Sequence, residues 1–186
     1  MAGVQSKFEL RAPPPAKETA IQRWILRALA FDRRIVVLDL SGVGNGPRGM
    51  TKSQRSNHRN RQIAHLYEVS LRRLAAVDGP AILVWRQNTG GMKDHRGQFV
   101  RFNLPGTPDL GGILRTSWGA YPISVEVKRP TGKPSKIQIA RALLFSSMGE
   151  ITLLAHSSEE AVERVGAILA AASEGRDALA LLTAAA

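Results

Sequence analysis

The sequence contains no cysteine, which excludes disulfide bonds and thiolate zinc sites and favours a reducing, intracellular setting. No apolar run approaches the roughly 20 residues that a helix needs to cross a bilayer. The first 18 residues, MAGVQSKFELRAPPPAKE, lack the apolar core of a signal peptide. We therefore expect a cytoplasmic protein with no membrane partner.

Acidic residues are scarce and unevenly placed along the chain. The 186 residues include 26 Lys and Arg against 15 Asp and Glu, a net charge of +11. Six of the acids lie in residues 150–186, so residues 1–149 hold 24 basic side chains against nine acidic ones. This imbalance favours a polyanionic partner such as a nucleic acid. The alternative is a solvated basic surface without a dedicated partner.

Hydrophobic periodicity predicts one α/β domain with a mixed central sheet of four to five strands flanked by helices. The strands are expected at 33–40, 81–86, 98–103, 109–115, 122–128 and 150–156. The helices are expected at 17–30, with Ile21, Trp24, Ile25, Ala28 and Leu29 on one side, at 62–76, at 135–148 and from about 158.

The domain is expected to span residues 17–172, after a flexible N-terminal arm at 1–16 and before an Ala-rich tail at 173–186. Within it, residues 32–80 form a basic segment inserted after the first helix.

The stretch SVEVKRP places two charges on one face of a predicted strand, because side chains at i and i+2 point the same way. These are Glu126 and Lys128. Asp109 begins the preceding strand after a Pro- and Gly-rich turn, so pairing of the two strands would bring it beside Glu126. Two close carboxylates suit Mg²⁺ or Mn²⁺, with the backbone carbonyl of Val127 as a further oxygen ligand. Lys128 could then position a water and stabilise charge at a phosphodiester undergoing hydrolysis.

The ordered set WRQNTGG, GQFVRFNLPGTPDLGGI and VEVKRPTGKPS, followed by the helical IQ, resembles the virus-type replication-repair nuclease (VRR-NUC) domain. That family belongs to the PD-(D/E)xK nucleases. The resemblance covers roughly residues 81–156 and the helix at 18–30. The family usually places its first helix close to the WR strand, so the insertion at 32–80 is a departure from it.

The resemblance implies a restriction-endonuclease-like core and divalent-metal-dependent hydrolysis of DNA by a homodimer. Branched DNA, of the Holliday-junction or flap type, is the expected substrate. Asp109 and Glu126 are implied as metal ligands, Lys128 as the catalytic lysine and Gln138 as the helical glutamine of the site.

The family also carries a glutamate on its first helix, and two residues compete for that role. At 100° per residue, Glu18 lies within about 60° of Ile21, Ile25 and Leu29, near the centre of the apolar face. Glu68 is roughly 130° from the middle of the apolar stripe of its own helix. We therefore expect Glu18 to complete the site, as a metal ligand directly or through a water. The alternative is an acid in the first helical turn with no role in the site.

Basic and polar side chains outside this set are candidate DNA contacts. They are Arg86, Asn88, Lys133 and Lys136 near the site, and Arg48, Lys52, Arg55, Arg59 and Arg61 in the insertion. The alternative for the insertion is a solvated loop.

Two other functions are compatible with parts of the sequence. Gly44, Gly46 and Gly49 follow the G-x-G-x-x-G spacing of a dinucleotide-binding loop, but the next residues are too polar for a helix that packs on a sheet. A nuclease fold that binds DNA or an assembly partner without cutting is the second alternative.

Overall fold

The structure is a computed structural model that describes residues 17–175 except 88–90, 94 and 102. In chain order the elements are α1 (Glu18–Leu29), β1 (Ile35–Leu38), α2 (Lys52–Ala75), β2 (Ala81–Arg86), β3 (Gly91–Lys93), β4 (Phe99–Arg101), β5 (Leu110–Arg115), β6 (Ala120–Val127), α3 (Lys136–Ser147), β7 (Ile151–Ala155) and α4 (Ser158–Ser173). The expected arm at 1–16 and nearly all of the expected tail lie outside the described residues.

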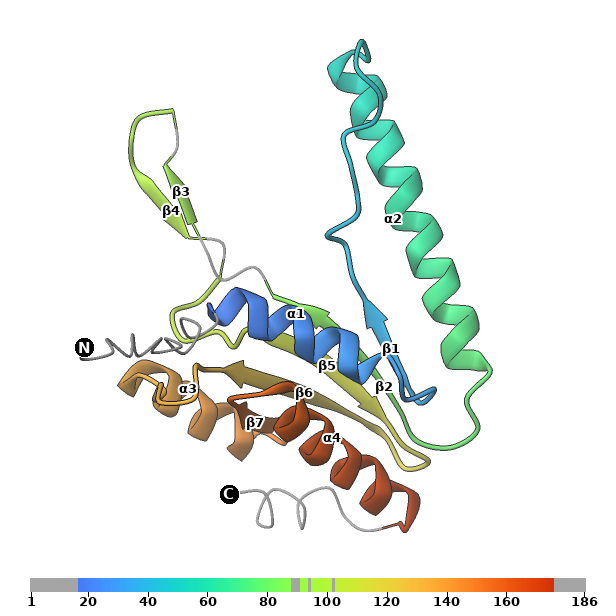
Figure 1. Cartoon of the computed structure of the whole chain (residues 1–186), viewed down its shortest axis with the longest axis vertical. Coiled ribbons are helices and arrows are strands. Elements are labelled where there is room, and N and C mark those ends of the chain that lie inside the picture. The colour runs from blue at the N-terminus through green and yellow to red at the C-terminus, as the bar shows by residue number, and fades with distance from the viewer. Residues whose placement is uncertain (1–16, 88–90, 94, 102, 176–186) are drawn as a thin grey trace, which may run out of the picture.

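A mixed five-stranded sheet forms the centre of the molecule, in the order β1-β2-β5-β6-β7 (Figure 1). The outer pairs β1–β2 and β6–β7 are parallel, and the inner pairs β2–β5 and β5–β6 are antiparallel. The carboxyl ends of β1, β2, β6 and β7 therefore meet the start of β5 at one edge. The prediction of a mixed sheet of four to five strands flanked by helices is confirmed. Strand β1 belongs to the segment 32–80 that was expected to be an insertion, and it forms part of this sheet.

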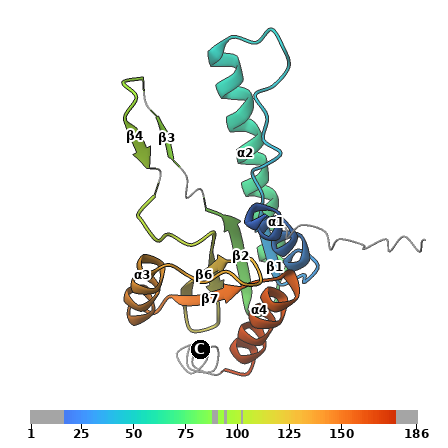
Figure 2. The same cartoon turned by 60° about the vertical axis from the view of Figure 1, so that its left-hand side comes forward.

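The two faces of the sheet are covered differently (Figure 2). On one face, strand residues such as Val84, Leu114 and Val125 pack with α1 and α4 in the apolar core. The opposite face, which we call the site face, carries Glu126 and the residues that lie beside it on the neighbouring strands. Here α3 contacts β7, and α2 contacts β1 at the other side of the sheet.

The buried side of α1 differs from the predicted one. Trp24 is 50% exposed, whereas Gln22 and Leu26 are buried beside the expected Ile21 and Ile25. The reason is that α1 packs against both the sheet and α4, which rotates its buried stripe away from Trp24.

Helix α2 begins ten residues before its predicted start. Thr51 caps it: its side-chain oxygen accepts from the backbone N–H of Gln54, and the Gln54 side chain accepts from the Thr51 N–H. Hydrophobic periodicity missed this half because residues 52–61 contain no apolar side chain. The helix stands out from the sheet as a rod. Residues 39–51 run alongside it from the end of β1 to the tip, where the helix begins (Figure 1).

The predicted strand at 98–103 is not part of the central sheet. Phe99–Arg101 pairs instead with Gly91–Lys93, part of a segment that was expected to be a turn, in a separate two-stranded sheet. Alternation predicts a strand correctly but does not identify its pairing partner. Within the described chain, no helix combines the length and apolar character needed to cross a bilayer.

The contrast between core and projecting helix gives a stability prediction. Leu114 is fully buried, so Leu114→Ala should lower the free energy of unfolding by about 2–5 kcal/mol. Leu71 on α2 is 68% exposed, so Leu71→Ala should change it by less than about 0.5 kcal/mol. Urea denaturation of both variants measures the difference. An equal loss of unfolding free energy in the two variants would mean that Leu71 is packed more closely than its exposure indicates.

Candidate active site

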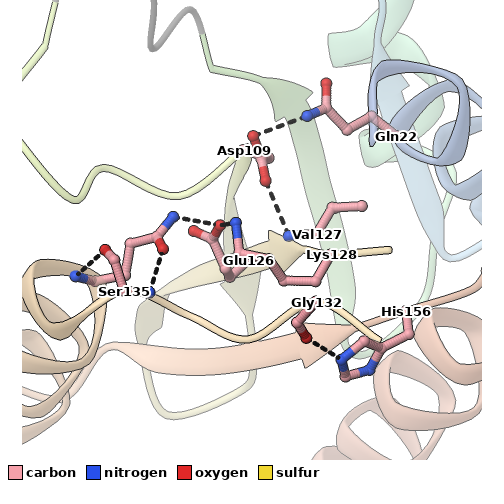
Figure 3. A network of polar contacts seen from close by, with 9 residues as sticks. Gln22, Asp109, Glu126, Val127, Lys128, Gly132, Ser135 and His156 are labelled. Atoms are coloured by element: carbon pink, nitrogen blue, oxygen red, sulfur yellow. Dashed lines mark hydrogen bonds and ion pairs between the residues drawn. The ribbon is translucent and has the colours of Figure 1, made fainter. Parts of the chain in front are cut away.

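Asp109 and Glu126 meet at the edge where β5 starts and β6 ends (Figure 3). Leu110 pairs with Val125, so the next position along each strand places Asp109 opposite Glu126. The turn before Asp109 requires glycine at position 106, where φ is 82° and a Cβ would lie 2.9 Å from the carbonyl oxygen of Ile137. The predicted pairing of these two strands is confirmed.

Asp109 accepts hydrogen bonds from two other elements. The side-chain amide of Gln22 on α1 donates to Oδ1 at 2.8 Å, and the backbone N–H of Val127 on β6 donates to Oδ2 at 2.9 Å. The carboxylate is therefore fixed relative to a helix and a strand at once.

Glu126 is held through one oxygen by two donors. Lys128 Nζ and Gln138 Nε2 both donate to Oε1, each at 2.5 Å. The amide oxygen of Gln138 accepts from the Ser135 N–H at 2.8 Å, as part of the capping box of α3. Because that oxygen is engaged by the helix cap, the amide nitrogen is directed at Glu126.

Burial dominates the protonation of the carboxylates. It raises the pKa of Glu126 to about 7, against the hydrogen bond from Lys128 and with support from the negative charge of Asp109. Burial also raises the pKa of Asp109, against the Val127 N–H and the charge of Lys128. Burial alone would lower the pKa of Lys128, but its hydrogen bond to Glu126 and the nearby carboxylates raise it. The site thus holds negative charge at a cost, which a proton or a cation relieves.

The structure places Glu18, and not Glu68, at this site. Glu18 lines a cavity with Lys128, Lys133 and Gln138, and its negative charge contributes to the raised pKa values of Asp109 and Lys128. Glu68 is 67% exposed on α2, where it pairs with Arg72 at 3.5 Å.

Sequence reasoning missed two residues of this network. Gln22 is 5% exposed and lies four residues after Glu18, so a polar side chain inside the apolar face of the first helix was the available signal. Ser135 caps α3, and the S-x-x-Q spacing of Ser135 and Gln138 was the signal for it.

The loop after Lys128 is fastened to the start of α4. His156 Nε2 lies 3.2 Å from the carbonyl oxygen of Gly132 (Figure 3). Its Nδ1 lies 3.2 Å from Glu160 Oε2. This contact fixes the loop that carries Lys133 along one side of the cavity.

The predicted DNA contacts separate into two groups. Lys133 lines the cavity beside Lys128, and Lys136 begins α3, whereas Arg86 ends β2 opposite Leu110 and lines the cavities next to α1 and α2. All five basic residues predicted in the insertion are exposed and lie on or just before α2: Arg48, Lys52, Arg55, Arg59 and Arg61. Asn88 lies outside the described residues.

The glycine-rich segment does not have the geometry of a dinucleotide site. β1 and β2 are parallel, as such a site requires, but α2 begins at the far tip of the rod and has no buried residue (Figure 1). A Cβ at Gly46 would meet the side chains of Met50 and His58. This glycine therefore packs against the first half of α2 and the segment just before it.

The donor set fits one small divalent cation. Mg²⁺ is commonly held by one or two carboxylates while water and phosphate oxygens complete its shell, and Asp109 and Glu126 supply such a pair. Gln22 Oε1 is a buried acceptor without a hydrogen-bond partner in the described chain, which suits a metal-bound water beside Asp109. Across the described ranges, no group of three or more His, Asp or Glu side chains is arranged to bind a metal. The Val127 carbonyl and Glu18 stay predicted additional ligands.

Comparison with known protein families, with curated proteins and with solved structures finds no match to this chain.

The raised carboxylate pKa predicts how stability depends on pH in metal-free buffer. The unfolded chain releases the Glu126 proton near pH 4.5, whereas the folded chain retains it to about pH 7. The folded state binds more protons in this window, so the free energy of unfolding falls as pH rises through it, at about 1.4 kcal/mol per unit. Glu126→Gln should match the wild type near pH 5 and exceed it in stability above pH 7. Denaturant titrations across pH measure this, and parallel curves for the two proteins would contradict the assignment.

Proposed function

We propose that this chain is a divalent-metal-dependent DNA endonuclease of the VRR-NUC type, with a restriction-endonuclease-like core. The observation that carries the proposal is the juxtaposition of Asp109 and Glu126 at adjacent strand ends, with Lys128 and Gln138 bonded to Glu126. Paired buried carboxylates beside a cationic donor suit hydrolysis of an anionic ester better than they suit structural support, because removing them from water is costly.

Asp109 and Glu126 would hold Mg²⁺ or Mn²⁺, and such an ion lowers the pKa of water and neutralises charge on a phosphodiester. Gln22 and the Val127 N–H keep Asp109 in place, and Gln138 does the same for Glu126. These contacts come from α1, β6 and α3, so the carboxylates are positioned before any substrate arrives.

Lys128 serves as the proton-bearing donor of the site. Its pKa is raised, so the ammonium group stays charged at neutral pH, and only one of its three N–H donors is directed at Glu126. The remaining donors can orient an attacking water and stabilise the charge that develops on the phosphate oxygens.

Branched DNA as the substrate and a homodimer as the active form are further parts of the proposal, and both derive from the family resemblance. A symmetric junction carries two strands to be cut, and a chain with one carboxylate pair supplies one cut. Sedimentation of the purified chain with and without a four-way junction measures the stoichiometry.

Cleavage and metal binding together test the proposal. We expect Mg²⁺ or Mn²⁺ to support cutting of a panel containing linear duplex, single strand, 5′ flap, splayed arm and four-way junction, and EDTA to stop it. Lys128→Ala should lower the rate by about 10²–10³-fold and still bind Mn²⁺ in calorimetry. Asp109→Asn should lose both cutting and Mn²⁺ binding.

Lys133→Ala is the matched comparison, since it removes a nearby ammonium group that is a predicted DNA contact but contacts neither carboxylate. It should raise the substrate concentration needed for half-maximal cutting, and it should cut at close to the wild-type rate when substrate is saturating. A wild type that shifts DNA on a gel and cuts nothing in any metal would replace the nuclease by a DNA-binding module.

A further inference from the structure

An open groove runs between α2 and the site face of the sheet, outside the carboxylate site. Its floor comes from β1, β2 and β5, its wall from α2 and its rim from the end of β2. The residues concerned are Leu38, Leu83, Trp85 and Ile113 in the floor, Tyr67 and Arg59 in the wall, and Arg86 at the rim.

The floor of the groove is apolar yet open to solvent. Ile113 is 43% exposed and Tyr67 53%, and Trp85 is half-buried. These side chains share one face because Leu38 pairs with Trp85 and Leu83 pairs with Ile113. The strip is left uncovered because α3 lies over β7 and α2 stands beside β1.

One stripe of α2 changes character where the helix leaves the sheet. Arg59, Ile63 and Tyr67 follow one another at spacings of four, so they lie on the same side of the helix. Arg61, a candidate DNA contact from its charge alone, lies about 160° away around the helix and does not line the groove, so we expect it to make no contact with a ligand bound there. The same side of α2 therefore presents the Tyr67 ring beside the sheet and the Arg59 guanidinium group beyond the sheet.

The positive charges along the groove are available to a ligand. Within the described residues, the side chains of Arg59 and Arg86 form neither an ion pair nor a hydrogen bond. Arg86 also lines a neighbouring cavity with Arg23, Arg27 and Arg73. Asp39 is the one acidic side chain among the residues that line these two cavities.

The groove and the carboxylate site lie on the same face of the sheet, with Gln87 between them. Gln87 lines the groove, and its backbone N–H donates to the carbonyl oxygen of Asp109 at 2.8 Å. Its side chain lies over Gly111, where an added Cβ would fall 2.1 Å from the amide nitrogen. Trp85 pairs with Gly111, which pairs with Ser124, two residues before Glu126, so groove and site lie on one face of one sheet.

We propose that this groove binds an unpaired, single-stranded segment of nucleic acid and leads it to the carboxylate site. A duplex turns its phosphates outward and its bases inward, so it would leave the apolar floor uncovered. An unpaired strand offers bases to Tyr67 and the floor, and phosphates to Arg59 and Arg86, which is the usual combination in single-strand binding. The delivery to the carboxylates rests on the proposed nuclease function, whereas the binding does not.

Binding is tested in EDTA by fluorescence anisotropy, with labelled oligo-dT, oligo-rU and a duplex of equal length. We expect the wild type to bind the unpaired strands more tightly than the duplex. Tyr67→Leu should weaken single-strand binding on the order of tenfold, and Tyr67→Trp should retain it, because stacking needs an aromatic ring.

Arg59→Gln and Arg61→Gln form a matched pair on opposite sides of one helix. Arg59→Gln should weaken binding and lower the slope of log K against log salt by about 0.7, as expected for one lost phosphate contact. Arg61→Gln should leave the affinity within about twofold of the wild type and the salt slope unchanged.

Three results would overturn the proposal: duplex bound as tightly as single strand, Tyr67→Leu without effect, or equal losses in the two arginine variants. Changed sedimentation of the protein alone in Tyr67→Leu would assign the groove instead to contact between copies. Asp109→Asn separates the two functions, because it should bind oligo-dT like the wild type even when it cuts nothing.

Discussion

The removal of two neighbouring carboxylates from water is the constraint on which the rest of this structure depends. Asp109 and Glu126 repel each other, and burial makes that repulsion stronger than it would be at the surface. Each is kept in place by donors from other elements, namely Gln22 of α1, the Val127 N–H of β6 and Gln138 of α3. The site therefore connects α1, β6 and α3 through polar contacts, in addition to the apolar packing of the core.

The mixed polarity of the sheet makes this arrangement possible. The antiparallel pair β5–β6 sets the two carboxylates opposite each other, because one strand starts where the other ends. The parallel outer strands bring their carboxyl ends to the same edge, so Gln87 after β2 and the loop after Lys128 both border the site. The loop is held there by the contact between His156 and Gly132.

The sequence predicted those features that depend on local geometry. Glu126 and Lys128 share a face because of the two-residue period of a strand, and Asp109 follows a turn that only a glycine-containing segment can form. Gln22 had a weaker signal, a polar residue beside the apolar face four positions after Glu18, because the buried side of α1 also depends on its contact with α4. The first half of α2 was missed because residues 52–61 hold no apolar side chain and so show no periodicity, and the cap at Thr51 was its one local signal. The hairpin of β3 and β4 shows that alternation identifies a strand without identifying its partner.

The two charged regions of the site face have opposite signs, and this has a consequence for the order in which ligands bind. Arg59 and Arg86 attract phosphate along the groove, whereas Asp109 and Glu126 repel it at the end. Under the proposed function, a strand can occupy the groove without metal, but its phosphate can reach the carboxylates only when a cation offsets their charge. Helix α2 connects the two regions to the sheet, because it contacts β1 and also carries Arg59. If both proposals hold, nucleic-acid binding in the groove is independent of metal, whereas engagement at the carboxylates is coupled to it.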